Sequence, residues 1–342
     1  MRPSHTSVVA FGEMLLRLAA PEGERLLQDT SLFRHYGGAE ANVCVLLAQL
    51  GVPVEFVSAL PPNPLGLGAI RHLKSFGVGT EAVQMEGNRL GLYYHESGAG
   101  VRSAKVHYDR AFSAFSQLQA RRIPWKEILA NAGWLHWSGI TPALGPQSIA
   151  LCEEALRAAR DLGVPVSVDL NYRDSLWDSG QQPSAVMPEL LSGTRVMNGD
   201  LHALDRMLGV TTDSSASIED RFNDAARQVK LLLPDLEVLA MSFRGTSANG
   251  LATYRGALHT DGATHFTNLH VIPVVTDRIG SGDAFMAGLL FGIFRANPWP
   301  DVIDFATACG VLKHSVAGDC AQFDESDVRD YLVHGLSLRV NR

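Results

Sequence analysis

Short apolar runs alternate with helical patterns along most of the chain. Runs with the length and β-branched content of buried strands lie at 7–11, 54–57, 164–168 and 271–275. Between them, apolar residues recur at helical spacing in 43–50 and 148–161, and a glycine, Gly51 or Gly163, follows each stripe as a helix stop. Strands that alternate with helices predict an α/β protein with a parallel sheet.

Polar residues follow one of these expected strands directly. The strand at 164–170 delivers Asp169, Asn171 and Arg173 to its carboxyl end. Open α/β sheets bind their ligands at that edge, so the pattern places candidate binding residues there.

Two stretches, 14–36 and 90–110, break the alternation. They are rich in strand formers, turn residues and charges, and neither has a long helical stripe. They predict a small antiparallel flap inserted into the α/β core. No internal repeat, low-complexity tract or long linker divides the chain, so we expect one domain over 1–342.

Composition narrows the class of partner. Of 342 residues, 46% are apolar and 19% charged, which allows a large core. The 29 basic and 36 acidic side chains give a net charge of −7 without a Lys/Arg block, so the expected partner is a small molecule and not nucleic acid.

The four cysteines lack metal or redox spacing and are expected to be reduced. No signal-like segment or membrane-length apolar run is present, and a cytoplasmic protein is expected.

The strongest local signal is the segment DRIGSGDAF at 277–285, between an expected strand and an apolar helix to about 294. Gly280, Ser281, Gly282 and Asp283 would lie at the helix N-terminus, where unpaired N–H groups and the helix dipole bind a phosphoryl group. Asp283, expected to be ionised there, could take a proton from an attacking hydroxyl. The alternative is a glycine-rich turn with an aspartate cap. No Gly-Lys-Ser/Thr is present, which excludes a P-loop.

A second glycine-rich segment, GGAEAN at 37–42, leads into the helix that ends near Gly51. Paired glycines let the backbone approach a sugar, and the Asn42 amide suits hydroxyl groups, although the pair alone also suits a strand-to-helix turn. With 280–283, this segment resembles the two signatures of the ribokinase-like (PfkB) carbohydrate kinases. The resemblance implies a three-layer α/β/α sandwich, a mostly parallel central sheet, a small β-sheet lid and the use of ATP.

Further segments narrow the resemblance: GEMLLRL at 12–18, YDR at 108–110, DLNYRDSLW at 169–177, LKHS at 312–315 and GD at 318–319. They are similar to the 2-keto-3-deoxygluconate kinases of that family, which implies phosphorylation of a keto-deoxy sugar acid, 2-keto-3-deoxygluconate, to its 6-phosphate. Asp283 is the implied base, and Arg173 the implied second catalytic residue, which stabilises the transferring charge or the substrate carboxylate. The implied substrate-binding residues are Gly38, Asn42, Tyr93, Tyr108, Arg110, Arg173, Asp283 and Asp319.

A carboxylate substrate would explain arginine in a sugar site. The planar guanidinium binds a carboxylate through two parallel hydrogen bonds, which a neutral sugar does not require. Arg110 and Arg173 are therefore expected to carry specificity. The alternative is a pair of surface arginines, and Tyr93 and Tyr108 taken alone also suit packed strand positions.

The resemblance also implies a nucleotide site, formed by Asn171, Asn198, Ser242, Arg244, Gly280, Ser281, Gly282 and Thr307. Relatives carry an N-x-x-E element that organises magnesium through water, but 198–201 reads NGDL, with Leu201 in place of the glutamate. We therefore expect Mg²⁺ to bind mainly through the nucleotide phosphates, with no metal ligand from the protein.

Two other functions stay open at this stage. A kinase for a neutral sugar, of the fructose or ribose type, is expected if Arg110 faces solvent. The absent glutamate also allows a sugar-acid sensor that has lost turnover. For the kinase, the expected partners are the sugar acid, ATP and further copies of the chain in a homo-oligomer; the sequence does not settle the epimer of the sugar acid.

Overall fold

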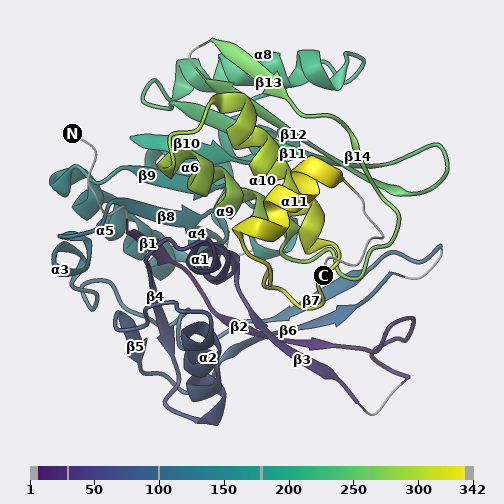
Figure 1. Ribbon diagram of the computed structural model, residues 1–342. Helices are drawn as coiled ribbons and strands as arrows, with labels where there is room; N and C mark the ends of the chain where they lie inside the picture. Colours follow the sequence, from purple (N-terminus) through teal and green to yellow (C-terminus); the bar gives the residue numbers. More distant parts are fainter. Residues whose placement is uncertain (1–6, 29–30, 99–100, 178–179, 261, 336–342) are drawn as a thin grey trace.

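The core strands are apolar along their whole length because helices cover both faces of their sheet. In β1 (Val8–Phe11), Val8 and Ala10 pack on one face while Val9 and Phe11 pack on the other, and all four are buried. The computed structural model in Figure 1 describes residues 7–28, 31–98, 101–177, 180–260 and 262–335. It confirms the predicted α/β sandwich with its mostly parallel sheet.

The central sheet has the order β13-β12-β11-β10-β9-β8-β1-β4-β5, and β14 pairs with β12. Its other strands are β4 (Val54–Leu60), β5 (Val83–Met85), β8 (Trp134–Ser138), β9 (Val166–Asp169), β10 (Thr194–Asn198), β11 (Val238–Thr246), β12 (Ala252–Thr260), β13 (Ala263–Phe266) and β14 (His270–Ile272). In this order, each strand from β11 through β10, β9, β8, β1 and β4 to β5 pairs in parallel with its neighbour. The pairs of β12 with β11, β13 and β14 are antiparallel, which the sequence analysis did not predict. A short turn joins β11 to β12, and such a turn imposes antiparallel pairing.

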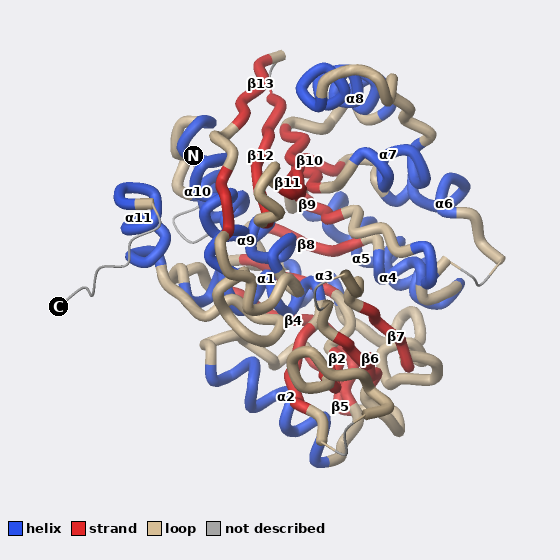
Figure 2. Tube along the Cα trace, turned by 90° about the vertical axis from the view of Figure 1, so that its right-hand side faces the viewer, coloured by secondary structure: helices blue, strands red, loops and turns tan. Residues whose placement is uncertain are grey.

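Helices form a layer on each face of this sheet, as Figure 2 shows. One layer contains α1 (Ala39–Gln49), α2 (Pro64–Ser75), α9 (Ser281–Phe294), α10 (Trp299–Lys313) and α11 (Glu325–His334). The other contains α3 (Trp125–Leu129), α5 (Pro146–Leu162), α6 (Pro183–Leu190), α7 (Leu201–Leu208) and α8 (Ile218–Leu232). The short helices are α4 (Ile140–Ala143) and the 3₁₀ turn Asp174–Leu176. In the described part of the chain no helix is long and apolar enough to cross a membrane, and the four cysteines are buried thiols.

A second sheet, which we call the lid, extends below the core in Figure 1. Its order is β3-β2-β6-β7, formed by β2 (Leu15–Ala19), β3 (Phe33–Gly37), β6 (Gly91–Glu96) and β7 (Lys105–Asp109). The expectation of a purely antiparallel flap was wrong, because β2 and β6 pair in parallel. They follow β1 and β5, two parallel core strands, and both leave the core at the same edge, so they run in the same direction.

The turn before α9 depends on one glycine. Gly280 has φ +84°, in the left-handed region, and a Cβ at this position would lie 1.9 Å from the carbonyl oxygen of Asp319. Just upstream, the Asp277 carboxylate accepts the Ile279 N–H at 3.0 Å. The turn therefore packs directly against the segment that carries Asp319, and only glycine fits it.

We expect Gly280→Ala to lower the free energy of unfolding by about 2–5 kcal/mol, since left-handed strain and overpacking add. Gly193→Ala is a matched control, because Gly193 has φ +81° but no atom within 4 Å of its Cβ position. That variant should lose only the strain, about 1–2 kcal/mol. Urea unfolding of both variants measures the difference, and equal losses would contradict the close packing at Gly280.

Candidate active site

A cleft of about 970 Å³ lies at the carboxyl edge of the sheet, between the core and the lid. The lid and the start of α1 supply Glu13, Gly38, Asn42, Tyr93, Tyr108 and Arg110. The ends of β10 and β11 supply Asn198, Asp200, Ser242 and Arg244. Asp169, Asn171 and Arg173 come from the end of β9 and the segment after it. Gly280, Gly282 and Asp283 come from the turn before α9 and from its first turn, and Asp319 comes from the loop after α10. One cleft thus brings together the residues expected to bind the sugar and those expected to bind the nucleotide.

Two expected site residues, Thr307 and Ser281, do not line the cleft. Thr307 is fully buried in α10, and its hydroxyl donates to the Ile303 carbonyl at 2.7 Å. Ser281 is buried at the start of α9, and its N–H donates to the Arg278 carbonyl at 3.3 Å. The α10 helix is apolar on nearly all sides, so it carries Thr307 into the core. The structure gives neither residue a place against a bound nucleotide.

Asp283 lies in the first turn of α9 and is held by Asn42. The Asn42 amide donates to an Asp283 oxygen at 2.7 Å, and the amide oxygen accepts the Gly38 N–H at 3.4 Å. Because both polar atoms of Asn42 have protein partners, this side chain orients Asp283. Asn42 also lines the cleft, so its expected role in sugar binding stays a prediction. The pattern of the sequence gives no sign of this contact between α1 and α9.

Burial raises the pKa of Asp283 to about 7. The Asn42 hydrogen bond and the Arg173 charge lower this pKa, whereas Asp169 and Glu40 raise it. The expectation that the helix N-terminus keeps Asp283 fully ionised was therefore wrong, because loss of hydration outweighs the favourable contacts. A carboxyl with a pKa near 7 suits a general base that works at neutral pH.

Backbone N–H groups and arginines next to Asp283 can bind an anion. The Gly282 and Asp283 N–H groups lie in the first turn of α9, where N–H groups have no intrahelical partner. A Cβ on Gly282 would lie 3.1 Å from Arg244 Nη2, so this guanidinium covers the helix start. Arg173 and Arg278 also line the cleft and are exposed. The sequence analysis did not single out Arg278, although it lies within the 277–285 segment.

Arg110 is buried against Glu13. Its Nε and Nη2 lie 2.7 and 2.6 Å from one Glu13 oxygen, and Ser113 donates to the other oxygen. The guanidinium also lies 5.6 Å from the centre of the Tyr108 ring. Arg110 therefore points into the cleft and not to solvent, so the condition for the neutral-sugar function is not met. Glu13, which the sequence analysis had not assigned, fixes the direction of this guanidinium.

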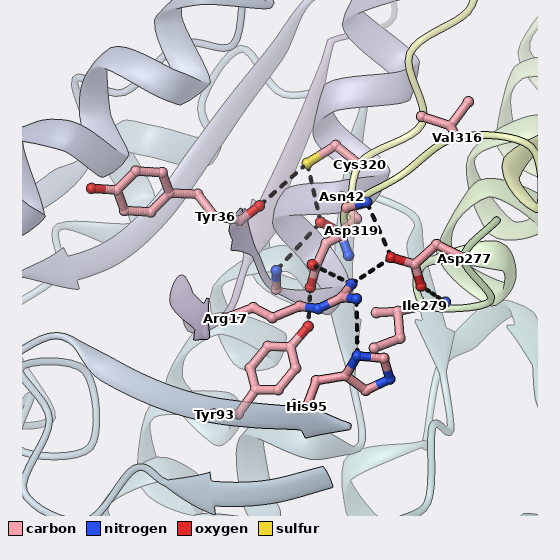
Figure 3. Close-up of polar contacts among 12 residues, drawn as sticks. Arg17, Tyr36, Asn42, Tyr93, His95, Asp277, Ile279, Val316, Asp319 and Cys320 are labelled. Carbon is pink, nitrogen blue, oxygen red and sulfur yellow. Dashed lines mark hydrogen bonds and ion pairs between the residues drawn. The ribbon is translucent and has the colours of Figure 1, made fainter. Parts of the chain in front are cut away.

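Arg17, at the centre of Figure 3, joins the lid to the core. Its Nη1 lies 2.7 Å from Asp277 and 3.3 Å from Asp319, and its Nη2 lies 3.0 Å from His95 Nδ1. The Tyr93 hydroxyl donates to Asp319. Tyr93 and Asp319 were expected to bind substrate; both line the cleft, but in this structure they bind each other.

The nucleotide end of the cleft offers oxygen atoms for a metal. Asn198 donates to Asp169 at 2.9 Å, and within the described ranges its buried Oδ1 has no partner. Asp200 instead caps α7, where it accepts the Ala203 N–H at 2.7 Å. Among the described residues, no three His, Cys, Asp or Glu side chains are placed to hold a metal ion. The Asp169 and Asn198 oxygens are hard donors and fit Mg²⁺ that other ligands also hold.

An α/β sheet with a free helix N-terminus, a carboxyl group beside it and a lid over both is an arrangement typical of small-molecule phosphotransferases. A model of the pfkB family of carbohydrate kinases matches residues 5–325. The chain belongs to the pfkB family of carbohydrate kinases, which confirms the resemblance stated above.

Similar proteins cover nearly the full length of the chain. A 2-dehydro-3-deoxygalactonokinase of Haloferax volcanii is 30% identical, over 96% of this chain and 97% of that protein. A 2-dehydro-3-deoxygluconokinase of Bacillus subtilis is 27% identical, over 97% and 95%. The crystal structure of a 2-dehydro-3-deoxygluconokinase from Thermotoga maritima superposes with a TM-score of 0.91 at 35% identity, over 96% of this chain and all of that one.

We expect kcat/KM for phosphoryl transfer to rise with pH up to about 7 and then to level off, because only ionised Asp283 accepts a proton. Asn42→Ala removes the hydrogen bond that lowers the Asp283 pKa, so its midpoint should move to higher pH. Asn88→Ala, at an exposed lid-side position, is the matched control. Rate profiles from pH 5 to 9 measure both midpoints; an Asn42→Ala midpoint equal to that of the control would contradict the assignment.

Proposed function

We propose that the protein transfers the γ-phosphoryl group of ATP to the primary hydroxyl of a keto-deoxy sugar acid. The expected substrate is 2-keto-3-deoxygluconate, also called 2-dehydro-3-deoxygluconate, and the product is its 6-phosphate. The observation that carries the proposal is Asp283, a carboxyl with a pKa near 7 beside the α9 N-terminus, in the same cleft as Arg110. Relatives named as kinases of 2-dehydro-3-deoxy sugar acids support it.

In the proposed reaction, the substrate hydroxyl attacks the γ-phosphorus and gives its proton to Asp283. The new O–P bond forms as the bond between the γ-phosphorus and the bridging oxygen breaks, and ADP leaves with that oxygen. The Gly282 and Asp283 N–H groups, with Arg173 and Arg244, stabilise the charge in transfer. Mg²⁺ would bind mainly to the phosphates and neutralise part of their charge, and the Asp169 and Asn198 oxygens would help to hold it. The lid excludes water, which otherwise competes with the sugar hydroxyl.

Arg110 and Arg173 are the proposed anion-binding arginines, and their settings differ. Glu13 holds two of the three guanidinium nitrogens of Arg110, so this side chain offers a fixed direction to an anion. The direction of the Arg173 side chain is less constrained, because it is exposed and only its Nη1 has a described hydrogen-bond partner, the Tyr172 carbonyl at 3.1 Å. We assign Arg110 to the substrate carboxylate and Arg173 to the transferring phosphoryl group.

The direct experiment measures ADP formation with MgATP and a panel of acceptors. The panel contains 2-keto-3-deoxygluconate, 2-keto-3-deoxygalactonate, fructose and ribose. The proposal expects turnover on a sugar acid far above that on either neutral sugar. Preference for fructose or ribose would support a neutral-sugar kinase, and sugar-acid binding without ADP would support a sensor.

Asp283→Asn should keep the fold and ATP binding while kcat falls by about 10²–10⁴, the usual contribution of a general base. Asparagine has nearly the same shape but accepts no proton at neutral pH. Single-turnover rates and calorimetric ATP binding check the two parts separately. Near-normal turnover in a variant that binds ATP would eliminate Asp283 as the base.

Arg110→Ala should cost about 30- to 4,000-fold in kcat/KM for the sugar acid, the effect of truncating one partner of a buried charge pair. Weak activity on fructose should hardly change, because a neutral sugar has no carboxylate to leave unpaired. The truncation also leaves Glu13 buried without its cation, so Arg110→Ala combined with Glu13→Gln separates substrate binding from folding. Arg89→Ala, which removes a half-exposed ion pair near β7, is the control. Equal fractional losses on both substrates in the double variant would refute the carboxylate assignment.

A cytoplasmic location and assembly into a homo-oligomer complete the proposal. The choice between the gluconate and galactonate epimers is left to the acceptor panel, since relatives of both names match the full chain.

A further inference from the structure

Arg17 lies on the lid strand β2, but its main charged partners belong to the core. Its side chain is 4% exposed. Asp277 comes from the turn before α9 and Asp319 from the loop after α10, whereas His95 and Tyr93 come from the lid strand β6. Arg17 and Tyr93 are directly paired in the parallel β2–β6 register, so they hold a fixed relation to each other within the lid.

The two acids that contact Arg17 also frame the turn at Gly280. Asp277 accepts the Ile279 N–H at 3.0 Å and the Gly318 N–H at 3.1 Å, so one carboxylate joins two core loops. Asp319 supplies the carbonyl oxygen against which Gly280 packs. Figure 3 shows the Arg17 guanidinium between these carboxylates, and the Tyr93 hydroxyl donates to Asp319. The guanidinium therefore holds both supports of the turn that carries the α9 N–H groups.

Charge balance makes this contact hard to replace. Two buried carboxylates close together repel each other and are costly to desolvate without a cation. Lys313 is another buried cation nearby, and its charge acts on Asp277 and Asp319 from a distance. Its ammonium donates to the Val316 carbonyl at 2.9 Å, and among the described residues it forms no direct ion pair with either acid. Arg17 is thus the cation that binds both acids directly, and it leaves them if the lid moves away.

We propose that Arg17 is a positioning residue that couples the seated lid to the shape of the phosphoryl-binding turn. This inference rests on the proposed phosphoryl transfer. With the lid seated, Arg17 holds Asp277 and Asp319, and these acids hold the turn at Gly280 in the conformation that presents the α9 N–H groups. With the lid lifted, the acids lose the cation that binds them directly, and the turn loses that support. Transfer to the sugar is thereby confined to the closed, water-excluding state.

The test compares Arg17→Met with Arg34→Met. Methionine keeps much of the apolar length of arginine but no charge, and Arg34 is an exposed arginine on the neighbouring lid strand β3. For Arg17→Met we expect kcat to fall about 10- to 100-fold, which is the effect of a small misplacement of catalytic groups. The KM values for ATP and for the sugar acid should stay within about threefold of the wild-type values. We also expect more ADP than sugar phosphate to be formed, because water gains access when closure and transfer are uncoupled. Arg34→Met should match the wild type in both measurements.

A second set of variants separates positioning from folding. Arg17→Lys keeps one charge but cannot bind both acids and His95, so it should show the same ratio of ADP to sugar phosphate above one. Tyr93→Phe, which removes only the hydroxyl donated to Asp319, serves the same purpose if neither Arg17 variant folds. In a double-mutant cycle, Arg17→Met and Asp319→Asn should together lose less kcat than the product of the single losses.

Three results would overturn the inference. The first is a folded Arg17 variant with normal kcat, and the second is a loss of kcat/KM that comes entirely from a higher KM. The third is a double variant whose loss of kcat equals the product of the losses in the single Arg17 and Asp319 variants. If neither Arg17 variant folds, normal coupling of ADP to sugar phosphate in Tyr93→Phe would overturn it as well. A wild-type protein without turnover on any acceptor would instead contradict the proposed function, so the two failures are distinguishable.

Discussion

Charged groups that are removed from water need partners, and this requirement determines how the lid joins the core. Arg17 binds Asp277 and Asp319, and Arg110 binds Glu13, in both cases with little exposure to solvent. Each pair links a lid strand or its flank to a segment at the carboxyl edge of the sheet. A lid held by such pairs has a defined position, because a shifted position would leave buried charges unpaired.

The same loss of hydration gives the cleft its chemistry. Burial raises the pKa of Asp283 to about 7, while Asn42 fixes the direction of the carboxyl. Around it, the N-terminus of α9 and the exposed guanidinium groups of Arg173 and Arg244 favour an anion. A proton acceptor and an anion-binding surface thus meet in one place, which is the arrangement that phosphoryl transfer to a hydroxyl requires.

Local patterns in the sequence predicted the elements that depend on local physics. The β1, β4 and β9 strands, the α1 and α5 helices and the helix after Gly280 follow from apolar periodicity and glycine stops. The two glycine-rich segments also supply part of the cleft lining, including Gly38, Asn42, Gly280 and Asp283. Thr307, to which the resemblance gave a nucleotide-binding role, does not line the cleft, because α10 turns it into the core.

The polar network could not be predicted in this way, because its contacts span the chain. Arg17 lies 260 residues from Asp277 and 302 residues from Asp319. No spacing rule connects such positions, and an arginine in a strand pattern gives no sign of its partner. The parallel pairing of β2 with β6 has the same origin, since it depends on where two distant core strands end.

The account claims that one cleft orders a sugar acid and ATP on either side of Asp283, and a crystal structure with a non-hydrolysable ATP analogue and 2-keto-3-deoxygluconate tests this most directly. We expect the γ-phosphate against the Gly282 and Asp283 N–H groups, the primary hydroxyl within hydrogen-bond distance of Asp283, and the carboxylate at Arg110. A γ-phosphate bound away from the α9 N-terminus, or a sugar acid whose hydroxyl faces away from Asp283, would contradict it.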